Sequence, residues 1–140
     1  MSNGSLLPNN PFLLNYWSNS YAKIARCNRF IEGIDKISAP EETIARYKAE
    51  ARFLRATQYF YLSQFFQDVP LVTNTLTKEE ANTVTKNSKA EVVSFIIKEF
   101  TESANELPRF KSLTANESGR ASKQAALAFL GRTLLADKKF

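Results

Sequence analysis

Hydrophobic residues recur at helical spacing over four long stretches of the chain, and polar stretches separate them. In the first stretch, spacings of three and four residues place Trp17, Tyr21 and Ile24 on one face of a helix. Similar spacings elsewhere predict an all-α protein of about four helices. The predicted helices run from Phe12 or Asn15 to Ile37, from Pro40 to Phe66, from Ser88 to Leu107, and from Ala121 or Ser122 onward.

The turns between these helices have their own signals. Ser38 stands three residues before Glu41, and Ser88 three before Glu91, which is the spacing of a capping box and predicts a helix start at each serine. Pro70 follows the second helix and predicts one short extended segment, which a polar loop joins to the third helix. Because only about three residues separate the first two helices, they are predicted to be antiparallel neighbours.

The second helix carries hydrophobic residues on two sides. At about 100° per residue, Tyr47 and Leu54 fall on one side, and Phe53 and Phe60 fall on roughly the opposite side. A helix that buries two sides has to lie between two layers. We therefore expect a middle helix whose Leu54 side packs on the first helix and whose Phe53 side packs on the third.

Three segments resemble the motifs of a known family. The run AEARFLRATQYFYLSQFFQDVPLV covers the second helix and the extended segment, and it resembles the pattern aEaRFLRAyyYfxLxxxfGdVPLv of the SusD/RagB family of outer-membrane lipoproteins. WSNSYAKIARCNRFIEGI before it and GRASKQAALAFLGRTLL after it resemble two further motifs, in the family's order. Gln67 is the clearest departure, because the family usually has glycine at that position.

The resemblance implies a fold, a function and a location. The implied fold is a tetratricopeptide-like array of antiparallel helical hairpins over residues 12–140. Residues 1–11 are polar, contain Pro8 and Pro11, and are predicted to be a flexible lead-in. The last helix has no room for a partner of its own, so we expect the array to be cut short at the C-terminus. The implied function is non-catalytic glycan binding and delivery to a SusC-like TonB-dependent transporter, at the cell surface on the outer membrane. Since the N-terminal segment has no secretion signal, we expect the signal and the lipid anchor of such a protein to lie outside this chain.

Composition narrows the remaining alternatives. The chain of 140 residues has no histidine and a single cysteine, Cys27, so the usual zinc sets and histidine-dependent triads cannot form within it. The net charge of +5 comes from scattered lysines and arginines, which is typical of a solvated surface and does not predict nucleic-acid binding. No catalytic residue, metal site or cofactor is predicted. The main alternative function is a helical repeat scaffold that binds other proteins, with a nucleic-acid adaptor after it and an enzyme last.

Candidate ligand-binding residues come from the start of the first helix. Glycan recognition needs flat aromatic faces with amide groups beside them. Trp17, Tyr16 and Asn15 supply both, although Trp17 also begins the hydrophobic face of its helix and has a second interpretation as a core residue. Other residues are predicted to have architectural roles through ion pairs, hydrogen bonds and packing: Asn28, Glu50, Arg52, Phe53, Leu54, Arg55, Pro70 and Arg120.

Overall fold

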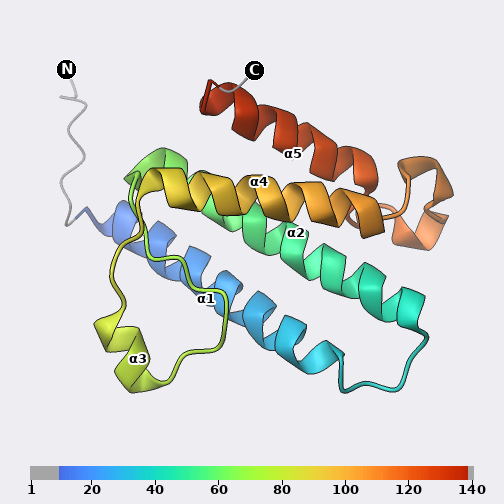
Figure 1. The fold of residues 1–140 in the computed structure, drawn as a ribbon, viewed down its shortest axis with the longest axis horizontal. Helices are drawn as coiled ribbons and strands as arrows, with labels where there is room; N and C mark the ends of the chain where they lie inside the picture. The colour runs from blue at the N-terminus through green and yellow to red at the C-terminus, as the bar shows by residue number, and fades with distance from the viewer. Residues whose placement is uncertain (1–9, 139–140) are drawn as a thin grey trace.

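The computed structural model describes residues 10–138, which form four long helices and one short one (Figure 1). Within these residues there is no β-strand, only an isolated antiparallel bridge between Val69 and Asn87. The all-α prediction is confirmed. The helices are α1 (Pro11–Ile34), α2 (Glu41–Phe66), α3 (Lys78–Thr83), α4 (Lys89–Glu106) and α5 (Lys123–Ala136), with 3-10 turns at Phe110–Ser112 and Ala115–Glu117.

The long helices pack as a tetratricopeptide-like array in which each one runs antiparallel to the next. Helix α2 packs against α1 and α4, while α5 packs mainly against α4. Figure 1 shows α2 behind α4 and between α1 and α5, with α3 apart from the long helices at the lower left. The prediction that the second helix lies in the middle of the fold is therefore confirmed.

Helix α1 begins earlier than the sequence pattern suggested. The Asn10 side chain accepts a hydrogen bond from the Phe12 amide at 2.9 Å, which caps the helix. Pro11 suits the first helical position, where its missing N–H needs no partner. The helix thus takes up the end of the predicted lead-in of residues 1–11, and residues 1–9 lie outside the described part of the chain.

One predicted helix cap is wrong and another is correct. Ser38 does not cap α2, because the helix begins at Glu41 after Pro40 and no side chain caps it. The fixed φ of Pro40 and the acidic residues in the first turn favour this start without a hydroxyl. Ser88 does cap α4, since its hydroxyl accepts a hydrogen bond from the Glu91 amide at 3.3 Å.

Helix α3 lies in the segment that was predicted to be a polar loop. The Thr77 hydroxyl accepts from the Glu80 amide at 3.2 Å, and the Glu80 carboxylate accepts from the Thr77 amide at 2.8 Å, so the helix has a complete capping box. Its six residues have no buried side chain. Without a hydrophobic stripe, periodicity gives no signal for such a helix, although the Thr-Lys-Glu-Glu run has the capping spacing.

Leu54 is not in the core, contrary to the prediction. Its side chain is 53% exposed, whereas that of Phe53 is 7% exposed. Helix α1 packs instead on the side of α2 that carries Arg55 and Tyr59, while α4 packs on the Phe53 side. These two buried sides lie about a third of a turn apart and not opposite each other. The side of α2 with Tyr47 and Leu54 therefore stays open.

Aromatic rings fill the core between α2, α4 and α5. The rings of Phe100 and Phe129 stack with their centroids 5.5 Å apart, and Phe53 meets each of them at 5.7 Å. Phe60 adds an edge contact to Phe129 at 5.9 Å. Burial of each such ring stabilises the fold by about 1.5–3 kcal/mol.

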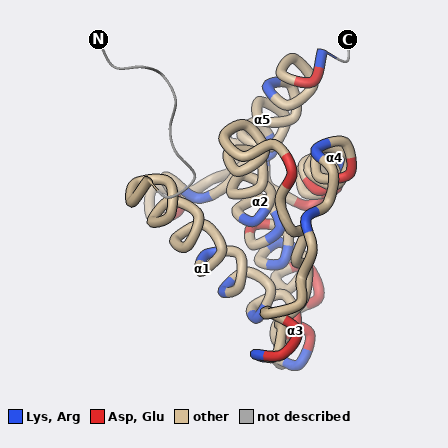
Figure 2. Tube along the Cα trace, turned by 90° about the vertical axis from the view of Figure 1, so that its left-hand side faces the viewer, with Lys and Arg blue, Asp and Glu red and all other residues tan. Residues whose placement is uncertain are grey.

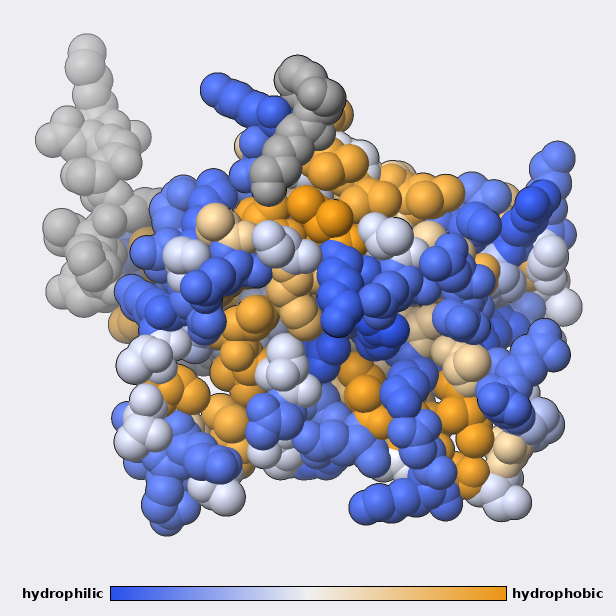
Figure 3. All heavy atoms as spheres, in the orientation of Figure 1, coloured by the Kyte–Doolittle hydropathy of each residue, from blue (hydrophilic) through white to orange (hydrophobic). Residues whose placement is uncertain are grey.

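Hydrophobic side chains also remain at the surface. Figure 3 shows them along the upper edge of the molecule, over α5, and in further patches between hydrophilic side chains on the same face. Leu127 and Leu135 of α5 are among the exposed hydrophobic residues. No helix within residues 10–138 combines the length and the apolar character needed to cross a bilayer.

Candidate functional site

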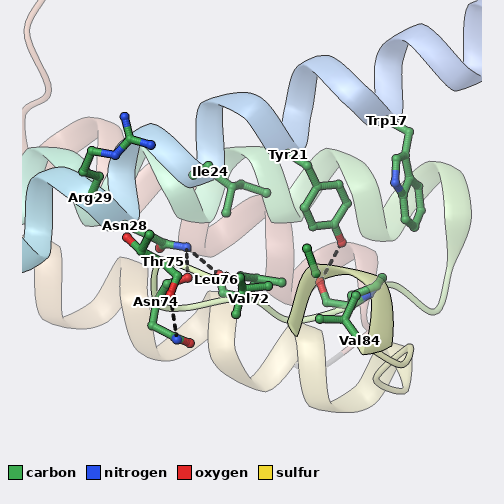
Figure 4. Close-up of a pocket in the computed structure, with 13 residues that line it drawn as sticks. Trp17, Tyr21, Ile24, Asn28, Arg29, Val72, Asn74, Thr75, Leu76 and Val84 are labelled. Carbon is green, nitrogen blue, oxygen red and sulfur yellow. Dashed lines mark hydrogen bonds between the residues drawn. The ribbon is translucent and has the colours of Figure 1, made fainter. Parts of the chain in front are cut away.

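An apolar pocket of about 380 Å³ lies between α1 and the segment of residues 70–84 that follows α2 (Figure 4). We call it the α1–α3 pocket. Trp17, Tyr21 and Asn28 line it from α1, and Val72, Leu76 and Val84 line it from the segment.

Two aromatic rings form the wall of the pocket on α1. The Trp17 and Tyr21 rings lie 5.0 Å apart between centroids, and Phe66 meets Trp17 edge-on at 5.0 Å. The Tyr21 hydroxyl donates to the Pro70 carbonyl oxygen at 2.6 Å, so its orientation is fixed. Burial raises the pKa of Tyr21 well above its ordinary value of 10. The tyrosine therefore offers its ring, and not a free hydroxyl, to a ligand.

Asn28 anchors the extended segment of residues 72–74, which forms the floor of the pocket. Its Nδ2 donates to the carbonyl oxygens of Val72 and Asn74 at 3.0 and 3.3 Å, and its Oδ1 accepts from Arg55 at 2.8 Å. The side chain is 1% exposed. Because protein partners already occupy both ends of this amide, it orders the extended segment and has no strong group left for a ligand.

Tyr59 fixes the same segment through the main chain of Val72. Its hydroxyl donates to the Val72 carbonyl oxygen at 2.9 Å and accepts from the Val72 amide at 2.7 Å. Burial raises the pKa of Tyr59 to about 12, so the hydroxyl keeps its proton at neutral pH. Both main-chain polar groups of Val72 are therefore hydrogen-bonded to a core residue.

A buried charge network supports the floor. Arg55 and Glu99 pair at 2.9 Å, with side chains only 6% and 5% exposed, and Arg55 also donates to the Thr73 carbonyl oxygen at 3.3 Å. Arg52 donates to the same Glu99 at 2.9 and 3.1 Å and also pairs with Glu102. The hydrogen bonds to Glu99 raise the pKa of Arg52. The network links α4 through α2 to the pocket.

Residues 75–87, which include α3, form the roof of the pocket, and hydrogen bonds attach this roof to the rest of the described chain only at its two ends. At one end, the amide and hydroxyl of Thr75 donate to the Glu32 carboxylate at 2.7 and 2.6 Å, and the hydroxyl bond is the main cause of a lowered pKa of Glu32. At the other end, the Asn87 amide donates to the Val69 carbonyl oxygen at 2.9 Å. Between them, no hydrogen bond joins residues 76–86 to any other part of the described chain.

The chemistry of the pocket suits an amphipathic ligand. Arg29, at one end, is its only charged lining residue within the described structure, and Asn74 adds an amide. Aromatic faces with a few polar groups at the rim match a sugar ring, which presents C–H faces and hydroxyl edges. No cluster of three or more histidine, cysteine, aspartate or glutamate side chains that could hold a metal ion occurs in residues 10–138.

The three predicted ligand-binding residues are not brought together. Trp17 lines the pocket, but Tyr16 packs against Phe65 and Phe66, with ring centroids 5.1 and 6.4 Å apart, and is not among the lining residues. Asn15 is exposed and also lies outside the pocket lining. Helical geometry separates them, because adjacent residues on α1 point in directions about 100° apart.

The sequence prediction missed Tyr21 and the segment of residues 72–84 as parts of the site. Tyr21 could have been found, because it stands one helical turn after Trp17 and shares its face. The segment could not, since it has no periodic pattern, and only its attachment to α1 through Asn28 and Glu32 brings it over the pocket.

Glu50 and Arg120 take part in a second ion-pair cluster that does not line the α1–α3 pocket. Arg120 donates to the Glu50 carboxylate at 2.6 and 3.1 Å, which ties the loop before α5 to α2. Arg46 lies 3.5 Å from Glu50 and pairs with Glu117 at 2.9 Å. The Arg120 guanidinium also sits over the Tyr47 ring, 5.0 Å from its centroid.

Comparison with known proteins gives a consistent set of relatives. The sequence profile of the SusD-like family, described as starch-binding and associating with the outer membrane, matches residues 5–135. SusD-like protein P2 of Formosa agariphila is 26% identical over 141 residues, and the alignment covers 100% of this chain and 27% of that protein.

Solved structures agree with this. A SusD-like carbohydrate-binding protein from Bacteroides fragilis is 55% identical, with a TM-score of 0.91 over 95% of this chain and 26% of that one. A laminarin-binding SusD-like protein is 33% identical, with a TM-score of 0.84 over 89% of this chain and 26% of that one. The chain thus spans about a quarter of the length of these relatives, with coverage of 27%, 26% and 26%.

Proposed function

The chain belongs to the SusD-like family, and from this premise we propose that it binds glycan without chemical change and that the α1–α3 pocket contacts the sugar. The observation that carries the proposal is the aromatic wall of Trp17 and Tyr21 facing a fixed, hydrogen-bonded floor. A sugar ring can stack on the aromatic faces while its hydroxyl groups reach Asn74 and Arg29 at the rim.

The related proteins support a glycan as the ligand. Two of them are named for binding carbohydrate and laminarin, and the family description names starch. Starch-derived and laminarin-derived oligosaccharides are therefore the first probes. The family is a binding family and not one defined by a reaction, which supports a non-catalytic role.

In the proposed role, the protein displays the glycan at the cell surface and delivers it to a SusC-like TonB-dependent transporter in the outer membrane. The family description supports this location. The roof, attached only at Thr75 and Asn87, would let a glycan enter and leave without disturbing the core. Failure of the full-length protein to co-purify with such a transporter from outer membranes would count against delivery.

One observation favours a second function, that of a scaffold for other proteins. Tyr47, Leu54 and Phe65 of α2 are exposed large hydrophobic residues on a single side of the helix. Surfaces of this kind mark protein interaction sites. The two functions do not exclude each other, because this side of α2 contributes no residue to the α1–α3 pocket.

The glycan proposal is tested by titrating the chain with laminarin-derived and starch-derived oligosaccharides. Trp17 is the only tryptophan, so its fluorescence reports directly on the pocket, and calorimetry gives the affinity. We expect Trp17→Ala to weaken binding about tenfold or more, because the stacking surface is lost. Val84→Ser, at the exposed roof, should weaken binding by a smaller factor.

Phe110→Ala is the matched control, because Phe110 is exposed and lies outside the pocket lining. It should bind like the unchanged chain. If the Trp17 and Val84 variants bound the oligosaccharides as tightly as the unchanged chain, the pocket would not be the glycan-binding site. If the unchanged chain bound none of them, the glycan-binding proposal would be wrong. Shortened oligosaccharides on chromatography would contradict the non-catalytic role.

A further inference from the structure

The open side of α2 forms the floor of a groove on the face that α4 does not cover. Figure 2 shows α1 and α5 standing apart, with α2 between them. One hollow of about 360 Å³ is lined by Phe30, Tyr47 and Leu54, and another of about 440 Å³ by Tyr61, Phe65, Arg132 and Leu135. We call the surface over these residues the α2 groove.

The floor of the α2 groove is a hydrophobic stripe that Gln58 interrupts between Leu54 and Tyr61. Tyr47, Leu54, Tyr61 and Phe65 follow each other at seven, seven and four residues, which keeps them on one side of the helix. At about 1.5 Å per residue, the stripe is about 27 Å long, or about five helical turns. Leu54 and Phe65 are more than half exposed, although the Tyr16 ring of α1 meets Phe65 at 5.1 Å. The Arg120 guanidinium covers part of Tyr47, so the stripe is most open around Leu54 and the exposed part of Phe65.

The α1 wall of the groove is basic. Lys23 and Arg26 precede Phe30 by seven and four residues, so all three share one face of α1. Both cations are exposed, and neither forms an ion pair with any described residue. Figure 2 shows successive basic positions along this helix.

The α5 side adds a further positive charge. The Arg132 guanidinium lies over the rings of Phe60, Tyr61 and Phe129, 5.3 to 5.9 Å from their centroids, and no carboxylate within residues 10–138 pairs with it. The acidic residue that lines the groove, Glu50, is already bound by Arg120. The rim of the groove therefore carries an excess of positive charge.

We propose that the α2 groove binds an amphipathic helix of another protein, with acidic residues on both sides of its hydrophobic stripe. A helix of about five turns matches the length of the floor, and a third helix can pack into the groove between two others. Carboxylates along its edges would meet Lys23 and Arg26 on one side and Arg132 on the other. A flat lipid surface cannot reach a floor recessed between α1 and α5, and a second copy would oppose one basic rim to another.

The test uses two synthetic helical peptides of about five turns. Both carry leucines at spacings of three and four, flanked by glutamates in one peptide and by lysines in the other. Fluorescence anisotropy with the 140-residue chain should show binding of the acidic peptide and about tenfold weaker binding of the basic one. Raising the salt concentration should weaken the acidic peptide's binding, because the rim contacts are solvent-exposed. The inference deepens the proposed scaffold function, and because no glycan is present the result is independent of the proposed glycan binding.

Variants locate the binding site. Leu54→Ser and the double variant Lys23→Glu, Arg26→Glu should each weaken the acidic peptide's binding about tenfold. Their matched controls are Phe110→Ser, an exposed hydrophobic residue elsewhere, and the double variant Lys98→Glu, Lys111→Glu, at two exposed lysines that line neither hollow of the groove. The controls should bind like the unchanged chain, and circular dichroism checks that all variants are folded.

Three results would overturn the proposal. Equal binding of the acidic and basic peptides would show a non-specific hydrophobic surface. Absence of binding by either peptide would remove the helix as an occupant. A dimer of the chain that Leu54→Ser dissociates in analytical ultracentrifugation would assign the groove to a second copy.

Discussion

Gln67 holds the unusual backbone conformation that ends α2. Its φ of 64° and ψ of −92° lie in a region that glycine adopts freely and that residues with side chains avoid. The sharp turn brings the Asp68 carboxylate to the Lys89 amide at 2.8 Å and puts Val69 into the core. The glycine of the family pattern at this position therefore has a conformational reason.

The variant Gln67→Gly should be more stable than the unchanged chain, by about 0.5–1 kcal/mol, because relief of the strained φ outweighs the greater freedom of unfolded glycine. The free energy of unfolding in urea measures this. Gln64→Gly, at an exposed position in the last turn of the same helix, should lose up to about 1 kcal/mol. If both glycine variants were destabilised alike, the turn at Gln67 would not be strained.

Residue types alone predicted that Arg52 and Arg55 form ion pairs, but not with which carboxylate. Their partner Glu99 lies 47 and 44 residues away in sequence, on a helix that carries other glutamates. Nothing in a single sequence distinguishes Glu99 from the other glutamates of α4. The choice is made by burial, because a carboxylate 5% exposed must be paired, while one at the surface need not be.

At the scale of elements, α3 and its flanking residues are the least supported part of the fold. Residues 77–86 are all exposed, and the segment is tied to the rest only around Thr75 and Asn87. Few buried contacts mean a low free energy of local opening. The roof of the α1–α3 pocket should therefore open far more often than its floor.

The attachment of this roof should depend on pH through Glu32. Hydrogen bonds from Thr75 hold the folded pKa of Glu32 below its ordinary value of 4.5, so the attachment is present above that pH and is lost as the pH falls through the lowered value. Hydrogen-exchange protection factors of residues 76–86 should fall over that range. In Glu32→Gln they should be low already at neutral pH.

Glu41→Gln serves as the control for this exchange experiment, since Glu41 lies in the first turn of α2, outside the pocket lining. It should leave the protection of the roof unchanged. High protection of residues 76–86 in Glu32→Gln at neutral pH would mean that packing, and not the contact with Thr75, keeps the roof in place.

Periodicity predicted the four long helices because each has a hydrophobic face to bury, but it assigned the wrong side of α2 to α1. The side with Arg55 and Ser63 is polar, yet it is buried because Asn28 and Glu99 satisfy the arginine. The apolar side with Leu54 is open instead. A helical pattern shows which sides are apolar, and only the neighbours decide which sides are covered.

Across the whole molecule, α2 makes the two hairpins one folding unit. It packs on α1 through Tyr59 and Phe66, and on α4 and α5 through Phe53. Detachment of any one long helix would expose a buried side of α2 or α4 to solvent. A single cooperative transition is expected for such a chain.

Phe53→Ala should lower the free energy of unfolding by about 3–5 kcal/mol, because a large cavity opens between α2, α4 and α5. The loss should appear equally in Trp17 fluorescence and in circular dichroism, although Phe53 has no ring contact with Trp17. Leu54→Ala, one residue on, should cost less than about 0.5 kcal/mol, because the side chain is exposed. A shift in circular dichroism without a shift in Trp17 fluorescence would show that the hairpins unfold separately.

The two hydrogen bonds between the Tyr59 hydroxyl and the Val72 main chain lower the entropic cost of binding a ligand at this residue. A main chain that is already fixed by the core loses little conformational entropy when a ligand settles on it. The roof, by contrast, loses freedom when a ligand orders it. A ligand that touches only the Val72 floor should therefore bind with a smaller entropic penalty than a longer one that also contacts Val84.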